Sequence, residues 1–108
     1  MCWFNCTFLI KKWLDDVLAK GWAYGDEGDK LKGKKDALAI SMGIKECDYQ
    51  PDGKYKATID QFIVPFKTTA LYCNLDFKGY FALYDSRHIT YDELEKNSRN
   101  YVRFVLNL

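Results

Sequence analysis

The chain has 108 residues, of which 48% are hydrophobic, 17% aromatic and 29% charged. This length allows one domain, and the apolar and aromatic content is too high for a disordered chain. The 16 lysines and arginines against 15 aspartates and glutamates give a net charge of +1. That balance argues against nucleic-acid binding, because affinity for phosphates comes from excess cations. No apolar stretch approaches the roughly 18 residues of a membrane span, so no membrane-spanning segment is expected.

Four cysteines are spaced irregularly along the chain: Cys2, Cys6, Cys47 and Cys73. Cys2 and Cys6 could share one helical face, but a metal site takes about four nitrogen or sulfur ligands and His88 is the only histidine, so no metal site is expected. The N-terminus shows neither a basic start nor a small-residue cleavage site. Reduced thiols and a cytoplasmic location are therefore expected. A redox thiol protein built on Cys2 and Cys6 is the weaker alternative, because no Cys-x-x-Cys motif supports it.

The first expected element is a helix from Thr7, which can cap its N-terminus, to about Lys20. Gly21 stands where a left-handed C-terminal cap belongs. Two lysine–aspartate pairs, Lys11–Asp15 and Lys12–Asp16, have the four-residue spacing of helical ion pairs. The apolar residues recur at the helical period and form the other face: Leu9, Ile10, Trp13, Leu14, Val17 and Leu18.

A run of apolar residues without alternation, Ala37–Met42, predicts a strand covered on both faces, as in parallel sheets. The polar segment from Gly43 to about Lys56 predicts a loop, with a turn at Pro51-Asp52-Gly53. A second amphipathic helix follows, and Pro65 should kink or break it because proline donates no amide hydrogen bond. Its apolar stripe consists of Ile59, Phe62, Ile63, Phe66, Ala70 and Cys73.

The residues Tyr80–Tyr84 predict a second buried strand. Thr90 and Glu93 have the spacing of a capping box, so a third helix should begin near Tyr91 and run close to the C-terminus. Helices that alternate with strands indicate an α/β fold with parallel strands. Two strands make a poor sheet, however, so the chain is expected to be part of a larger arrangement.

No catalytic triad or phosphate-binding loop is expected, because no Gly-x-Ser-x-Gly turn exists and the glycine spacings match neither a dinucleotide nor a Walker motif. What remains is a set of aromatic side chains in loops: Trp3, Phe4, Trp22, Tyr24, Tyr49 and Tyr55. Ligands of open parallel sheets bind beyond the carboxyl ends of the strands, where Gly43–Lys56 leaves the first strand. Flat aromatic side chains in these loops suit a planar ligand. The alternative is that the first four of these aromatic side chains only pack loops onto the core.

Several short motifs resemble the flavodoxin-like NAD(P)H dehydrogenases, or NAD(P)H:quinone oxidoreductases, including the modulator-of-drug-activity and potassium-efflux ancillary flavoproteins. The similarity covers nearly the whole chain, in order and at compatible spacing. The matching segments are Trp3-Phe4-Asn5, Lys11-x-Trp13-x-Asp15-x-Val17, Gly21-Trp22-Ala23-Tyr24-Gly25, Leu31-Lys32-Gly33-Lys34-Lys35, Ser41-Met42-Gly43, Tyr49-x-Pro51-Asp52-Gly53 and Pro65-Phe66 followed by Thr69.

The resemblance implies a flavin site, FMN or FAD, with NAD(P)H as co-substrate. The loop matching Trp3, Phe4 and Asn5 would hold one edge of the flavin ring, and the loop matching Ser41, Met42 and Gly43 would supply backbone donors to its polar edge. Tyr49 matches a tyrosine near the nicotinamide or quinone, and Tyr55 stands where some members have histidine; these two are the candidate catalytic residues. Ile44 replaces a glycine that is common in this loop.

The resemblance also implies the C-terminal part of a flavodoxin-like three-layer α/β/α fold, with residues 1–108 as a single truncated domain. Family members begin with a strand, a phosphate-binding loop, a helix and two more strands before the segment that matches Trp3. The implied activity is two-electron reduction of quinone-like acceptors by NAD(P)H. A homodimer or a complementing polypeptide is expected, because strand Ala37–Met42 would lack a neighbour. The alternative is a flavin-free module that only self-associates or binds a partner.

Overall fold

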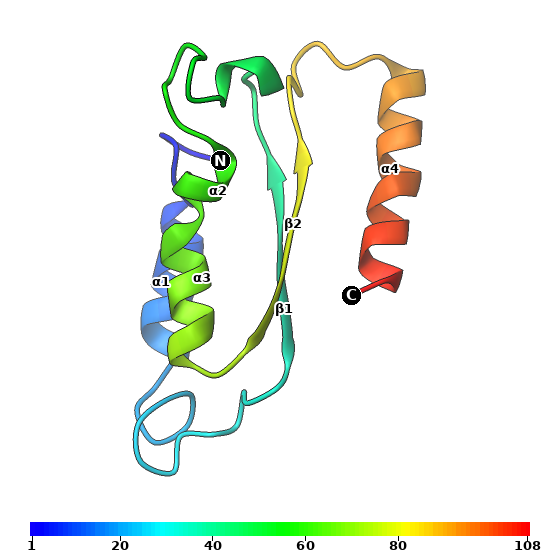
Figure 1. The fold of residues 1–108 in the computed structure, drawn as a ribbon. Helices are drawn as coiled ribbons and strands as arrows, with labels where there is room; N and C mark the ends of the chain where they lie inside the picture. The colour runs from blue at the N-terminus through cyan, green and yellow to red at the C-terminus, as the bar shows by residue number, and fades with distance from the viewer. The chain divides into compact units, whose positions relative to one another are not determined.

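The order helix, strand, helix, strand, helix that the sequence predicts is confirmed in the structure, a computed structural model that describes residues 1–108. The chain forms two units, residues 1–36 with 59–77 and residues 37–58 with 78–108. The elements, labelled in Figure 1, are α1 (Phe8–Val17), β1 (Lys35–Ser41), the 3₁₀ helix η1 (Glu46–Asp48), α2 (Ile59–Phe62), α3 (Val64–Tyr72), β2 (Asp76–Leu83) and α4 (Tyr91–Leu106).

The two strands are parallel neighbours in a two-stranded sheet. Asp76 donates its backbone N–H to the carbonyl of Lys34 (2.8 Å), and Met42 donates to Leu83 (2.8 Å), so the pairing advances in the same direction along both strands. β1 begins two residues before the expected strand and ends one residue earlier, and β2 begins four residues earlier. No residue of β1 is buried, so the expected covering of both its faces is not found in this chain.

Helix α1 begins where its cap predicts, because the Thr7 hydroxyl accepts the backbone N–H of Ile10. Both predicted ion pairs, Lys11–Asp15 and Lys12–Asp16, are present on its surface. The expected end at about Lys20 is wrong: the helix stops at Val17. Beyond it, tight turns at residues 19–24 replace the helical hydrogen bonds. The backbone N–H of Trp22 donates to the carbonyl of Ala19, and that of the left-handed Gly21 donates to the carbonyl of Tyr24.

The expected break at Pro65 is confirmed. The second helix is divided at Ile63 into α2 and α3. Pro65 lies in the first turn of α3, where backbone N–H groups make no helical hydrogen bond, so the N–H that proline lacks is not needed there. Within the predicted stripe, Ile59, Ile63 and Ala70 are buried, whereas Phe62 and Phe66 are only half-buried. Figure 1 shows α3 alongside α1 in the first unit.

Replacing Phe62 or Phe66 by alanine is therefore expected to lower the free energy of unfolding by about 1–3 kcal/mol, less than for a fully buried phenylalanine. Urea unfolding of the two variants measures the loss. Leu71→Ala is the control on the same helix, since Leu71 is 74% exposed and its truncation should change stability by less than about 0.5 kcal/mol. If all three variants lose the same free energy of unfolding, the stripe that contains Phe62 and Phe66 does not form the packed face of the helix.

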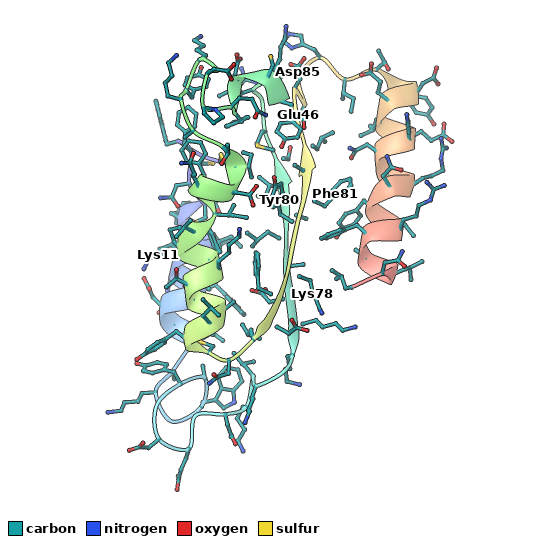
Figure 2. All side chains as sticks on the ribbon, viewed as in Figure 1. Lys11, Glu46, Lys78, Tyr80, Phe81 and Asp85 are labelled. Atoms are coloured by element: carbon teal, nitrogen blue, oxygen red, sulfur yellow. The ribbon has the colours of Figure 1, made fainter.

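Helix α4 begins with the predicted capping box, in which Thr90 and Glu93 each accept the other's backbone N–H (both 3.2 Å). It packs on β2 through the Phe81 ring, which lies 5.3 Å from the ring of Tyr101 and 5.9 Å from that of Phe104, measured between ring centroids. Figure 2 shows Phe81 pointing toward α4 and Tyr80 pointing to the other face of the strand. None of the helices is long and apolar enough to span a membrane.

Candidate functional site

The segment Cys2–Asn5 is a two-residue hairpin turn in which the terminal residues exchange both backbone hydrogen bonds, each 2.9 Å. The two central residues have left-handed backbones, with φ of 49° at Trp3 and 60° at Phe4. Turns of this kind normally place Asn and Gly at these positions, because a bulky side chain with positive φ is strained. Asn5 also holds the following residue, since its Oδ1 accepts the backbone N–H of Cys6 (2.8 Å).

Packing explains why an aromatic residue stands at position 4 of this turn, but not at position 3. The Phe4 ring lies 5.6 Å from the ring of Phe62, and the ring of Tyr24, in the next loop, lies 5.2 Å from that of Tyr72. These contacts fit the alternative that loop aromatics pack on the rest of the chain, and the role of Phe4 at a flavin stays a prediction. Trp3 is 95% exposed. A strained, exposed tryptophan stabilises nothing in this chain, and residues of this kind cluster at ligand sites.

Trp3→Gly is expected to raise the free energy of unfolding by about 0.5–1 kcal/mol. Glycine removes the left-handed strain, worth about 1–2 kcal/mol, but adds about 0.5–1 kcal/mol of chain entropy to the unfolded state. Phe4→Gly is the matched variant: it relieves the same strain but loses the contact with Phe62, so it should destabilise. Destabilisation by Trp3→Gly in urea unfolding would mean that the exposed indole supports the fold.

An open, mainly apolar groove of about 800 Å³ lies beside this turn, within the first unit. One side is formed by the segment from Cys2 to Leu14 and the other by three residues of α3, Pro65, Phe66 and Thr69. Its volume falls in the range of small-molecule sites. Trp3 and Asn5 line it, so the predicted ring-contacting turn borders a space that a planar ligand can enter.

In the second unit, the segment Ser41–Gly43 leaves the carboxyl end of β1. Met42 is buried, and its backbone bonds to β2 and the loop after it, since it donates to Leu83 (2.8 Å) and accepts from Ser86 (3.0 Å). The N–H groups of Gly43 and Ile44 donate no hydrogen bond within the chain. The backbone donors that the resemblance implies for this loop are thus available at Gly43. Ile44, which replaces a common glycine of the family, offers a second one.

Nothing in the fold requires glycine at position 43. Its φ lies outside the left-handed region, and a Cβ placed there would meet only Arg87 Nε, at 3.8 Å. Gly53 in the same unit differs, because a Cβ there would lie 2.6 Å from the carbonyl oxygen of Cys47. A glycine without a structural role at the end of a parallel strand fits a position where a ligand approaches the backbone closely.

The tyrosines form a cluster in the second unit. Tyr49 is only 3% exposed, and its ring centroid lies 6.5 Å from that of Tyr55 and 6.0 Å from that of Tyr84. Burial, and secondly the nearby Tyr55 and Asp48, raise the pKa of Tyr49 above its usual value. Its phenol therefore stays protonated and acts as a hydrogen-bond donor rather than a base. Tyr55 is half-buried and accessible, with Lys54 Nζ 5.4 Å from its ring centroid.

Burial and, next, the neighbouring Tyr80 raise the pKa of Tyr84 from 10 to about 12. Because the pKa of Tyr84 is higher in the folded chain than in the unfolded one, its protonated phenol stabilises the fold. This contribution to the free energy of unfolding is complete below pH 10 and is lost as the pH rises toward 12. With allowance for its partial exposure, Tyr84 should contribute roughly 1–2 kcal/mol to that loss. Alkaline unfolding of Tyr84→Phe should show a decline smaller by this amount, and an identical decline would contradict the assignment.

A cavity of about 470 Å³ lies in the second unit between the end of β2, the following loop and α4. Glu46 and Asp85, both labelled in Figure 2, line it together with His88, whose Nδ1 lies 2.8 Å from Asp85 Oδ1. The residues Asp85–His88 carry no functional motif in the sequence. The signal that points to them is their place after the second parallel strand, since carboxyl ends of parallel strands share one edge.

The structure thus assembles the predicted site residues in two groups. Trp3, Phe4 and Asn5 belong to the first unit, and the remainder belong to the second: Ser41, Met42, Gly43, Tyr49 and Tyr55. That both groups contact one flavin ring, as the resemblance implies, stays a prediction. No three His, Cys, Asp or Glu side chains gather in an arrangement that would hold a metal ion.

A family model described as a flavodoxin-like fold matches residues 1–105. The chain is 41% identical, over 105 residues, to a relative from Bacillus subtilis (strain 168) named uncharacterized NAD(P)H oxidoreductase YrkL; the match covers 97% of this chain and 60% of that protein. It is 32% identical to the glutathione-regulated potassium-efflux system ancillary protein KefG of Cronobacter sakazakii, over 94% of this chain and 55% of that one.

Among solved structures, the chain resembles the crystal structure of general stress protein 14 from Treponema denticola in complex with FMN. The TM-score is 0.89 and the identity 43%, over 94% of this chain and 58% of that chain. The expected α/β fold of flavodoxin-like type, with parallel strands, is thereby confirmed. The chain spans between 55% and 60% of the length of these relatives.

Proposed function

Since this chain belongs to the flavodoxin-like fold family, we propose that it is the flavin-contacting part of an NAD(P)H-dependent oxidoreductase that reduces quinone-like acceptors by two electrons. The strained, 95% exposed Trp3 carries this proposal, because it borders an apolar groove and strained residues of this kind cluster at ligand sites. The NAD(P)H oxidoreductase name of one relative and the FMN complex of another support it. The free thiols fit the reducing cytoplasm.

The residues present fit a flavin ring. Trp3, Phe4 and Asn5 would contact one edge of it, and the apolar groove beside them has room for a planar group. The loop after β1 would meet the polar edge with the free N–H groups of Gly43 and Ile44. When bound, a flavin would supply the chemistry of hydride transfer between NAD(P)H and the acceptor.

The remaining site residues would position the co-substrates. Tyr55 is accessible beside the buried Tyr49, so its ring offers a surface on which a nicotinamide or a quinone can stack. Tyr49 keeps its proton and would support the Tyr55 ring from the buried side. FMN is the preferred cofactor because the related structure contains it, and FAD is the alternative.

Reconstitution tests the proposal. The purified full chain is incubated with excess FMN and separated from free flavin, and the visible flavin band of the protein fraction is recorded. A yellow protein that oxidises NADPH in the presence of a soluble benzoquinone is the expected result. A folded chain that stays colourless with both FMN and FAD would overturn the proposal.

The second candidate is a flavin-free module that associates with itself or with a partner polypeptide. The surface of α1 favours it, because four large apolar side chains are between 47% and 84% exposed: Phe8, Leu9, Ile10 and Trp13. β1, with one strand neighbour and no buried residue, also leaves an edge for another strand. The ancillary-protein name of one relative fits a partner as well. Sedimentation at micromolar concentration should show a dimer or larger species; a monodisperse monomer would contradict self-association.

A further inference from the structure

The loop that follows β2 is fixed against the candidate flavin-contacting loop. Asp85 donates its backbone N–H to the carbonyl of Ile44, and Ser86 donates to that of Met42, each at 3.0 Å. Both loops belong to the second unit. The backbone of Asp85 and Ser86 is therefore fixed beside the segment Met42–Ile44, and Arg87 follows it directly.

Arg87 is the cation that this arrangement places beside Gly43. Its Nε would lie 3.8 Å from a Cβ on that glycine. The Arg87 side chain makes no ion pair or hydrogen bond within the chain, and the nearest carboxylate on its own loop, that of Asp85, is engaged by His88 (2.8 Å). Five guanidinium N–H donors are thus available directly next to the loop proposed to meet the polar edge of the ring.

We propose that Arg87 contacts the polar edge of the bound flavin ring and stabilises the negative charge that develops there on reduction. This inference rests on the proposed function. A hydride brought from NAD(P)H carries two electrons and one proton, so a neutral ring gains one negative charge and the nicotinamide gains one positive charge. The Gly43 and Ile44 amides supply only neutral dipoles, whereas a guanidinium supplies a full charge and charge-assisted hydrogen bonds.

The test measures the two-electron reduction potential of FMN bound to the full chain, by equilibration with redox dyes. Arg87→Met should make this potential more negative by about 30 mV, which is a tenfold change in the equilibrium constant. Arg87→Lys retains the charge and should restore at least half of the shift. Arg103→Met is the matched control, because Arg103 is exposed on the last turn of α4. Circular dichroism of each variant establishes that it is folded.

The outcomes separate the inference from the function on which it rests. If the unsubstituted chain binds no flavin, both are overturned. If it binds FMN and Arg87→Met leaves the potential unchanged, or if Arg103→Met shifts it equally, the inference alone is overturned. The same holds if the only effect of Arg87→Met is a higher KM for NADPH with an unchanged KM for NADH, since the charge would then serve the co-substrate's phosphate.

Discussion

An alanine at position 28 is expected to lower the free energy of unfolding by more than about 3 kcal/mol, at the upper end of the effects of overpacking. Gly28 is buried, and a Cβ there would lie 1.9 Å from the carbonyl oxygen of Tyr24 and 2.7 Å from its nitrogen. These are rigid backbone atoms, so the loop itself must move. The left-handed conformation plays no part, because the φ of Gly28 lies outside that region.

Urea unfolding of Gly28→Ala measures the effect, and Gly21→Ala is the control that isolates backbone strain. Gly21 has φ of 81°, and a Cβ there would meet nothing within 4 Å, so alanine at this position should lose only about 1 kcal/mol. If both variants lose the same free energy of unfolding, the close approach of the Tyr24 backbone is not the reason for glycine at position 28.

Local signals in the sequence predicted most helix starts and the one helix break. Thr7 and the Thr90–Glu93 pair satisfy backbone groups within four residues, and Pro65 lacks a donor in any context, so their effects do not depend on the rest of the chain. The end of α1 at Val17 accompanies the tight turns at residues 19–24, which the spacing of the apolar residues does not reveal. The early start of β2 at Asp76 depends on hydrogen bonds to a distant segment. One such bond joins the Asp76 N–H to the carbonyl of Lys34, 42 positions earlier in the chain (76 − 34).

The candidate site likewise has features that the sequence could predict and features that depend on the tertiary structure. Composition and spacing indicated which loops carry aromatic and small residues, and the resemblance gave those loops a flavin-binding role. The sequence could not show that Trp3 is exposed whereas Phe4 packs on Phe62, because both follow from the tertiary position of one turn. It also could not show that Arg87 lies beside Gly43, since the two residues are brought together only by the pairing of β1 with β2.

Gly43→Ala should leave the fold intact but weaken flavin binding by about 10- to 100-fold. In the free chain, a methyl group at position 43 meets only the flexible side chain of Arg87, at 3.8 Å, so the free energy of unfolding should change by less than about 1 kcal/mol. In the complex, the same methyl group would point into the space proposed for the ring. Overpacking of about 1–3 kcal/mol corresponds to this loss of affinity.

Titration of the full chain with FMN, followed by quenching of flavin fluorescence, measures the affinity of the unsubstituted protein and of Gly43→Ala. Gly21→Ala provides the comparison, because Gly21 lies in the first unit and outside the proposed contacts, and its affinity for FMN should be unchanged. Equal affinities in all three proteins would remove Gly43 from the flavin site. Unfolding of Gly43→Ala at much lower urea would instead assign this glycine to the fold, and the open space beside it would then no longer indicate the approach of a ligand.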